Sequence, residues 1–259
     1  MWDPARYEVY ADERSRPFTE LLARVPAEAP GTVVDLGCGS GVLTARLADR
    51  WPSAAVTGVD SSAEMLAEAA RLGRPGRLEF RHGAIEDWRP DRPVDVLVSN
   101  AALHWVPDHG ALLGRLVDAV APGGWLAFQV PGNFGSPTHA ILGELRSSQR
   151  WRSRLGGLSD RGPGVLEPAD YLDRLMSLGC AVDAWETTYL HVLHGDDPVL
   201  EWVRGTALRP VLAALASDPG AGAEFEREYG ARLRAAYPAT EHGTVLPFRR
   251  VFVVTRRQA

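Results

Sequence analysis

The sequence predicts an α/β fold, a doubly wound and mostly parallel sheet with a helical lid insertion and an antiparallel last strand. Short apolar strands alternate with helical apolar spacing between Thr32 and Val130, a pattern typical of a parallel sheet covered by helices. After Pro131 this alternation stops, and glycine-rich segments and proline-broken helices follow. The chain closes with an alternating strand at 249–256, far in sequence from its expected partner at 180–189. These two strands are therefore expected to enclose a helical insertion.

The elements follow from local sequence. A helix is expected before the sheet, with Pro17 in its first turn and Phe18 and Leu21 on its apolar face. Pro122-Gly123-Gly124 is expected to end a helix before the next strand begins. The expected strands lie near 32–36, 55–59, 78–81, 94–99, 124–130, 180–189 and 249–256. The expected helices lie near 41–50, 62–71, 107–120, 137–149, 168–177, 198–206, 208–217 and 223–236.

The length of 259 residues suits one large domain with an insertion. We therefore expect a single domain over 1–259. Its expected parts are an N-terminal helical cap (1–30), a cofactor-binding core (31–131), helical substrate-lid insertions (132–178 and 195–240) and final sheet strands (180–190 and 249–256).

The composition is that of an ordinary globular protein, with 45% hydrophobic and 24% charged residues. A net charge of −5 gives no indication of nucleic-acid or anionic-membrane binding. The two cysteines, Cys38 and Cys180, predict neither a disulfide framework nor a zinc site, and no metal is expected. There is no apolar run of membrane-spanning length and no apolar signal core, so the expected location is the cytoplasm.

A glycine-rich turn follows the first expected strand, with Gly37, Gly39 and Gly41 at alternate positions. Glycine permits positive φ and lets a ligand touch the backbone, and the N–H groups of the next helix suit a carboxylate or a phosphate. A dinucleotide-binding turn has its third glycine at the sixth place, which Val42 occupies, so an NAD dehydrogenase is disfavoured. The alternative is an ordinary strand–helix turn. Asp35 is placed to accept from the α-amino group of an amino-acid-like ligand.

This acid-x-Gly-x-Gly-x-Gly pattern resembles the first motif of S-adenosylmethionine-dependent methyltransferases, whose sheet is Rossmann-like. Asp60 lies 21 positions after Gly39, close to the roughly 20 that separate a glycine turn from a ribose-binding acid. The alternative role of Asp60 or Ser61 is to cap the following helix, and both roles are compatible. In the methyltransferase pattern Met65 lies near the adenine, and its alternative is a core methionine.

Two further loops complete the expected cofactor site. In the methyltransferase pattern the loop 81–88 holds the adenine, but a carboxylate is missing at Ala84. Backbone groups of Ala84 and Ile85, or Glu86, must then serve. The apolar strand 94–99 opens into a loop where ligands bind in doubly wound sheets. The residues placed there are Asn100, Ala101, His104 and Trp105, although His104 and Trp105 have ordinary surface and core alternatives.

The resemblance extends along nearly the whole chain to the family of trans-aconitate 2-methyltransferases. Its specific segments are Trp2-Asp3-Pro4, Glu13-Arg14-Ser15-Arg16-Pro17, Leu103-His104-Trp105-Val106-Pro107, the run 179–191 and Leu208-Arg209-Pro210. The family implies methyl transfer from S-adenosyl-L-methionine to one carboxylate of trans-aconitate, which yields a monomethyl ester and S-adenosyl-L-homocysteine.

An ionised carboxylate is already a nucleophile, so no catalytic base is expected, and rate enhancement comes from alignment and the exclusion of water. A trianionic substrate instead needs cations and hydrogen-bond donors. The candidate cations are Arg14, Arg16, Arg209, Arg249 and Arg250, each in a loop or at the end of an element. Arg16 and Arg209 are favoured, and Arg14 or Arg16 is an alternative partner for the cofactor carboxylate. Arg249 and Arg250 are neighbours in a strand, so at most one reaches the site. The expected substrate-binding residues are Tyr7, Arg14, Arg16, His104, Asn133, Tyr189, His191 and Arg209.

Three other functions stay open. The first is methyl transfer to a phenol, an amine or another acid. The second is a nucleic-acid methyltransferase, which is disfavoured because Asn100-Ala101-Ala102-Leu103 departs from the Asn/Asp-Pro-Pro-Tyr/Phe run of that class and the chain is acidic. The third is a non-catalytic S-adenosylmethionine binder. The expected partner is a small tricarboxylate, with no nucleic acid, membrane or protein partner.

Overall fold

The computed structural model describes residues 11–158 and 164–258, with the side chains of 11–14 left undescribed. These residues form two compact units. The sheet unit comprises 14–131, 164–187 and 250–258, and the helical unit comprises 11–13, 132–158 and 188–249. None of the described helices has the length and apolar character needed to cross a membrane.

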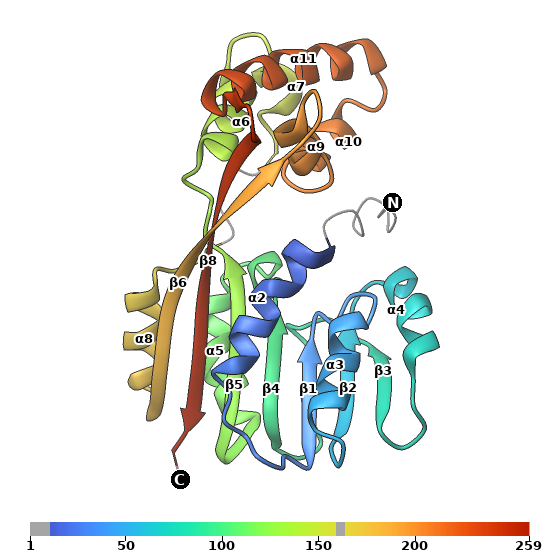
Figure 1. Ribbon diagram of the computed structural model, residues 1–259, viewed down its shortest axis with the longest axis vertical. Helices are drawn as coiled ribbons and strands as arrows, with labels where there is room; N and C mark the ends of the chain where they lie inside the picture. Colours follow the sequence, from blue (N-terminus) through green and yellow to red (C-terminus); the bar gives the residue numbers. More distant parts are fainter. Residues whose placement is uncertain (1–10, 159–163, 259) are drawn as a thin grey trace. The chain divides into compact units, whose positions relative to one another are not determined.

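The sheet has the strand order β3-β2-β1-β4-β5-β8-β6, and β7 pairs with β8 (Figure 1). Strands β1 to β5 pair in parallel, and β8 runs antiparallel to β5, which confirms the predicted fold class. The strand bounds are β1 Thr32–Leu36, β2 Ala55–Asp60, β3 Leu78–His82, β4 Val94–Asn100, β5 Val120–Pro131, β6 Cys180–Leu193, β7 Ala239–Thr240 and β8 Gly243–Arg257.

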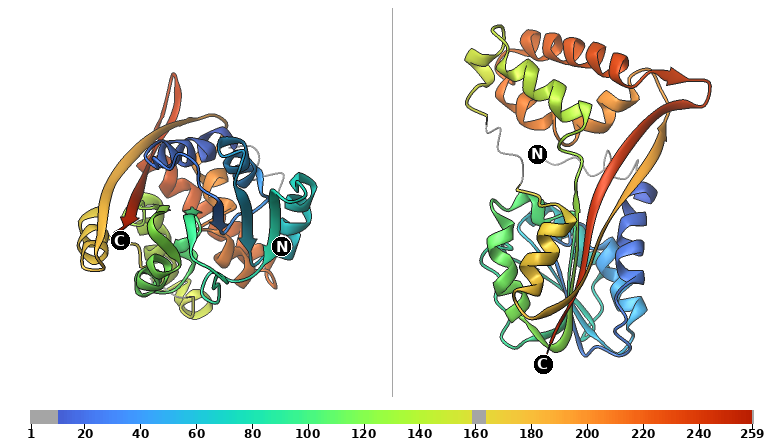
Figure 2. Two further views of the ribbon diagram at one scale, coloured as in Figure 1. Left: turned by 90° about the horizontal axis from the view of Figure 1, so that it is seen from below. Right: turned by 90° about the vertical axis from the view of Figure 1, so that its left-hand side faces the viewer.

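Helices cover both faces of the sheet unit. Figure 2 shows α2 (Ala11–Ala23) and α3 (Val42–Arg50) on one side of the sheet, and α5 (His109–Asp118) and α8 (Pro168–Met176) on the other. Helix α4 (Ala63–Ala69) follows β2 and continues into a 3₁₀ turn, η1 (Ala70–Leu72).

The main core of the sheet unit lies under α5 and α8. Helix α8 was expected in the insertion 132–178, but it belongs to this unit, because Tyr171 and Leu175 are fully buried in that core. The Tyr171 hydroxyl also lies 2.5 Å from Nε2 of His109 on α5. The core further contains Val34, Leu36, Leu97, Leu113, Phe128, Val130, Val251 and Val253.

Several boundaries differ from the predictions, and β8, for example, begins at Gly243 instead of near residue 249. Pro17 lies inside α2, which begins before its expected first turn. Strand β5 begins at Val120, and its pairing register with β4 shifts between Val94 and Val96, so Pro122-Gly123-Gly124 forms an irregularity within the strand. Helix α11 begins at Pro219, because the Asp218 side chain accepts from the amide of Ala221 and caps it.

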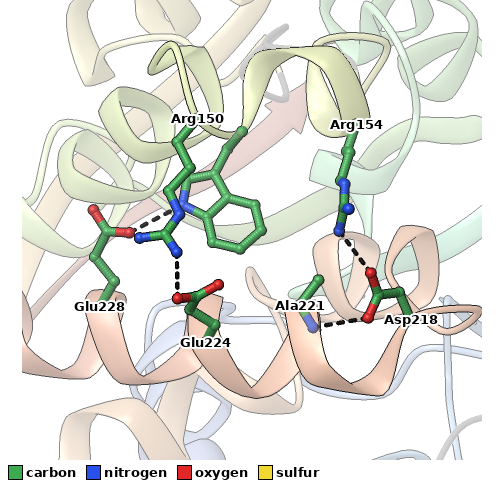
Figure 3. Close-up of polar contacts among 7 residues, drawn as sticks. Arg150, Arg154, Asp218, Ala221, Glu224 and Glu228 are labelled. Atoms are coloured by element: carbon green, nitrogen blue, oxygen red, sulfur yellow. Dashed lines mark hydrogen bonds and ion pairs between the residues drawn. The ribbon is translucent and has the colours of Figure 1, made fainter.

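The helical unit has its own core. Its helices are α6 (Pro137–Ser147), α7 (Arg152–Leu155), α9 (Pro198–Arg204), α10 (Arg209–Ala214) and α11 (Pro219–Ala236), of which α7 was not predicted. Polar contacts join α11 to the segment around α7 (Figure 3). The Trp151 indole donates to Glu228 at 3.0 Å, and Arg154 contacts Asp218 at 2.9 Å. Arg150 pairs with Glu224 in the same row. The aromatic side chains Trp151, Phe225 and Tyr229 are buried in the core of this unit.

Candidate active site

The carboxyl ends of four parallel strands meet at one edge of the sheet unit. Because β1 to β4 all run in the same direction, the segments that follow them emerge at this edge, where ligands bind in doubly wound folds. All of the predicted cofactor residues lie at or after these strand ends: Asp35, Gly37 and Gly39 for β1, Asp60, Ser61 and Met65 for β2, Ala84 and Ile85 for β3, and Asn100, Ala101 and Trp105 for β4.

The glycine turn after β1 needs glycine for two different reasons. Gly37 has φ +79°, and a Cβ there would lie 2.1 Å from Cβ of Ala102. Its amide donates to the Val59 carbonyl at 2.8 Å, which fastens the turn to β2. Gly39 has φ +54°, yet among the described residues no atom lies within 4 Å of a Cβ built on it. The backbone at Gly39 is therefore open to a ligand, and the capless N-terminus of α3 follows directly.

The Asp60 carboxylate is held by backbone amides on both sides. One oxygen accepts from Gly39 and the other from Ser62, each at 2.8 Å. Each oxygen keeps a second lone pair, so the group can still accept from two ribose hydroxyls. The cap of α4 is Ser62, whose hydroxyl accepts from the amide of Met65 at 3.2 Å, so the alternative of Asp60 or Ser61 as cap is wrong. Ser61 itself is exposed.

Asp35 is buried, with 3% of its surface exposed. Its carboxylate accepts a hydrogen bond from the Thr44 hydroxyl at 2.7 Å and so braces α3 against β1. Burial raises the pKa of Asp35 to about 6, the Thr44 hydrogen bond lowers it, and the charge of Asp60 raises it further. The Thr44 contact was not predicted. A contact of Asp35 with a ligand amino group stays a prediction.

The loop after β3 offers mainly backbone donors. The Ala84 carbonyl accepts from the amides of Asp87 and Trp88 at 3.2 and 3.0 Å. The Ile85 carbonyl accepts from Arg115 at 3.3 Å. Because both carbonyls are engaged, the amide N–H groups of this loop are the better candidates for an adenine ring nitrogen.

The end of β4 is strained. Ala101 has φ +53°, a left-handed conformation that a residue with a Cβ seldom adopts, and its amide donates to the Gln129 carbonyl at 2.8 Å. The 3₁₀ turn η2 (Leu103–Trp105) follows and places His104 and Trp105. The Trp105 side chain is exposed, and its ring centroid lies 4.7 Å from that of His104.

His104 is neutral in this environment. Burial lowers the pKa of His104 to about 3, and the charge of Arg250, and of His109 if protonated, lowers it further. Within residues 11–158 and 164–258, no hydrogen-bond partner reaches His104 Nδ1 or Asn100 Oδ1, although both atoms are buried. Polar atoms in this state are candidates for ligand contacts, because burial without a partner is costly.

Two polar residues of the same edge were given little weight by sequence reasoning. Gln129 is fully buried in β5, and Arg250 of β8 is 5% exposed. Arg250 donates to Gln129 Oε1 at 3.2 Å. A signal was present, because Gln129 is a lone polar residue in the apolar run Trp125–Val130.

The remaining predicted substrate residues are divided between the two units. Arg16 is exposed on α2 of the sheet unit. In the helical unit, Tyr189 and His191 are buried on one face of β6, with ring centroids 6.2 Å apart, and Arg209 is the exposed first residue of α10. His191 also stacks on Trp202 at 4.8 Å.

Asn133 is partly buried, and its carbonyl accepts from the amide of Ser136 at 3.0 Å. Tyr7 lies outside the described residues, and the Arg14 side chain is not described. In the part of the chain that the structure describes, no group of three or more His, Cys, Asp or Glu side chains is arranged to hold a metal ion.

This edge therefore combines an open backbone at Gly39, the amide-bound carboxylate of Asp60 and buried polar atoms of Asn100 and His104. A family model described as a methyltransferase domain matches residues 10–178. That match covers more than half of the chain, so the chain belongs to the methyltransferase family, whose members are enzymes. A relative named trans-aconitate 2-methyltransferase, from Streptomyces coelicolor (strain ATCC BAA-471 / A3(2) / M145), is 53% identical and covers 99% of this chain and 86% of its own.

Solved structures show the same fold. The YcgJ protein from Bacillus subtilis has a TM-score of 0.60 at 14% identity, and the match covers 95% of this chain and 99% of that one. A complex of DhpI with SAH has a TM-score of 0.50 at 30% identity, and covers 69% of this chain and 83% of that one. The likeness to YcgJ concerns the fold alone.

Proposed function

We propose that this protein transfers the methyl group of S-adenosyl-L-methionine to a carboxylate of trans-aconitate, giving the monomethyl ester. The observation that carries the proposal is the 53% identity to a relative of that name over 99% of the chain. This match includes the helical unit as well as the sheet unit, whereas the methyltransferase family model ends at residue 178. A similarity confined to the sheet unit would support only methyl transfer in general.

The proposed cofactor fits the residues at the sheet edge. Gly39 leaves its backbone open, Asp60 presents two oriented carboxylate oxygens to a ribose, and Asn100 offers a buried carbonyl oxygen to an amino group. The DhpI complex supports the assignment, because SAH is the demethylated form of this donor. When bound, the cofactor supplies a methyl group on a sulfonium.

The chemistry proposed for these residues is alignment without a base. The pKa of a free carboxyl lies well below 7, so the substrate carboxylate is ionised before it binds. His104 is neutral because its pKa is lowered to about 3, and it serves as a hydrogen-bond partner without moving a proton. The strained Ala101 fixes the loop that carries His104 and Trp105. The rate enhancement then comes from positioning and from excluding water.

We propose that the substrate is bound by the residues that the sequence predicts. In the sheet unit these are Arg14, Arg16 and His104, and in the helical unit Asn133, Tyr189, His191 and Arg209, together with Tyr7. We propose that the helical segments 132–178 and 195–240 act as the substrate lid, except that α8 serves the core of the sheet unit. One of Arg14 and Arg16 is also a candidate for the cofactor carboxylate.

The test measures kcat/KM for a panel of di- and tricarboxylates with saturating S-adenosylmethionine, and adds phenols and amines as competing acceptors. Trans-aconitate is expected to give the highest value. A higher kcat/KM for a phenol, an amine or another acid would show that trans-aconitate is not the substrate, while the protein would still be a methyltransferase. Arg16→Ala and Arg209→Ala are each expected to lower kcat/KM about ten- to a hundredfold, since a charged hydrogen bond contributes roughly 1.5–3 kcal/mol. If neither changes kcat or KM, these arginines do not bind the substrate.

A further inference from the structure

Three polar side chains lie where β4, β5 and β8 meet in the sheet unit, and we call them the donor cluster: His104, Gln129 and Arg250. Gln129 and Arg250 are buried, and His104 is partly buried with its Nδ1 atom enclosed. The strand register brings it together. Asn100 pairs with Gln129 across β4 and β5, and Gln129 pairs with Phe252 across β5 and β8. Arg250 is two residues from Phe252, so its side chain emerges on the same face as that of Gln129. The 3.2 Å hydrogen bond from Arg250 to Gln129 Oε1 follows from this register.

Two members of the cluster, Gln129 and His104, each have a buried nitrogen atom without a partner among the described residues. With Oε1 occupied by Arg250, the Gln129 amide nitrogen is left, and it is buried without a partner among the described residues. His104 Nδ1 is in the same state. Gln129 is fully buried, and Arg250 is 5% exposed. A buried amide nitrogen without a partner is costly, so its presence at a ligand-binding edge indicates a contact made in the complex.

The charge of the cluster selects the kind of ligand. Arg250 is permanently positive and Gln129 is neutral, while His104 stays uncharged because burial and Arg250 lower its pKa to about 3. Donors beside one fixed cation match a carboxylate, which accepts through two oxygens. They do not match a cation or an apolar group. The nearby Asn100 Oδ1 is an acceptor and suits an ammonium group instead.

The position of the cluster favours the carboxylate of the acceptor substrate over that of the cofactor. The glycine turn and Asp60 belong to β1 and β2, whereas Gln129 and Arg250 belong to β5 and β8, beyond β4 in the sheet order. At about 4.8 Å between neighbouring strands, β8 lies roughly 14 Å from β1. If the cofactor binds Asp60 through its ribose and Asn100 through its ammonium group, its amino-acid end would lie at β4. The acceptor is then expected beside β5 and β8, the strands that follow β4 in the sheet.

We propose that His104, Gln129 and Arg250 form the receptor for a non-reacting carboxylate of the acceptor substrate. This proposal rests on the proposed function and adds to it the residues that anchor the substrate in the sheet unit. The reacting carboxylate is then a different one of the same molecule, and a monocarboxylic acceptor has nothing to place in the cluster. The same chemistry would also suit the cofactor's own carboxylate, and the experiment distinguishes the two.

The experiment uses Gln129→Glu in the full-length protein. Glutamate is nearly isosteric, gains an ion pair with Arg250 and puts a negative charge where the substrate carboxylate is expected. Arg250→Lys keeps the charge but loses the planar fork. The control is Arg256→Met on the same strand, because Arg256 contacts the Gly123 carbonyl and the Trp125 ring instead. The readouts are KM and kcat for trans-aconitate and the Kd for S-adenosylhomocysteine by calorimetry.

Gln129→Glu is expected to raise KM for trans-aconitate at least tenfold and Arg250→Lys several-fold, with Kd for S-adenosylhomocysteine and the Arg256→Met values within about twofold of wild type. An increase in Kd with KM unchanged would overturn the proposal, because the cluster would then hold the cofactor carboxylate. No change in either would also overturn it. Wild-type transfer to trans-aconitate tests the proposed function separately. If another acid is the substrate, its KM is used, and if no acid is methylated or bound, both proposals fail.

Discussion

An added methyl group at Gly37, Gly39 and Gly76 should have three different effects. All three residues have positive φ, at +79°, +54° and +72°. A Cβ in the left-handed region costs about 1–2 kcal/mol, so each alanine variant carries that destabilisation. The variants differ in what the new methyl group meets, and this difference separates folding from ligand binding.

At Gly37 the new Cβ would lie 2.1 Å from Cβ of Ala102, whereas carbon atoms normally approach to about 3.5–4.0 Å. Ala102 has no flexible end to move, so the backbone of one of the two segments must shift. Overpacking of this kind costs about 1–3 kcal/mol, which brings the expected total for Gly37→Ala to about 2–5 kcal/mol. Gly39→Ala and Gly76→Ala should lose only about 1–2 kcal/mol, because nothing described lies within 4 Å of either Cβ.

The assays are urea unfolding for stability and calorimetry for S-adenosylhomocysteine affinity. Gly39→Ala is expected to stay folded but to weaken affinity more than tenfold, since its methyl group occupies the space open to the ligand. Gly76→Ala, in a surface turn before β3, should match its stability and keep wild-type affinity. Wild-type affinity in Gly39→Ala would refute the assignment of the turn to cofactor binding, and equal stability of Gly37→Ala and Gly39→Ala would refute the clash.

Four further predictions concern buried polar groups. Thr44→Val should destabilise by about 1–3 kcal/mol in urea unfolding at pH 7, because Asp35 loses its hydrogen bond, and an unchanged midpoint would contradict this. The pKa of Asp35 rises on folding from 3.8 to about 6. Its contribution to the free energy of unfolding therefore falls by about 3 kcal/mol as the pH rises from 3.8 to 6, and Asp35→Asn should lack this fall. The pKa of His104 falls on folding from 6.5 to about 3, so its contribution to the free energy of unfolding is full above pH 6.5 and is lost as the pH falls toward 3. His104→Asn should abolish that loss. For Asp35 or His104, stability curves against pH that run parallel in wild type and variant would refute the pKa shift. Glu228→Ala leaves the buried indole N–H of Trp151 unpaired and should cost about 1–3 kcal/mol, whereas Glu228→Gln keeps an acceptor and should cost less; equal thermal midpoints would argue against this contact.

The gathering of the proposed cofactor residues at one edge of the sheet was predictable from the sequence, because its determinants are local. The glycines, the acid at Asp60 and the polar end at Asn100 each follow an apolar strand within a few residues. Parallel strands then place these segments at one edge, whatever the details of packing. The cap of α4 was missed because Asp60, Ser61 and Ser62 are all good capping residues, and only the backbone geometry selects Ser62.

The donor cluster was harder to predict because it depends on long-range register. Gln129 and Arg250 are 121 positions apart, and the pairing of β5 with β8 decides that they meet. Shifting that pairing by one residue would direct Arg250 to the other face. The start of α11 was misplaced for a local reason, because Gly220 and Gly222 lower the helix propensity of a segment that Asp218 and Pro219 nevertheless initiate.

The most direct measurement follows a labelled methyl group from S-adenosylmethionine into trans-aconitate with the purified wild-type protein. Mass spectrometry identifies the product, and mild base then tests whether the label is held as an ester. The predicted result is a single monomethyl ester that base converts back to trans-aconitate with release of the label. Label that stays bound after base treatment, or that enters an amine or phenol and no acid, would contradict transfer to a carboxylate.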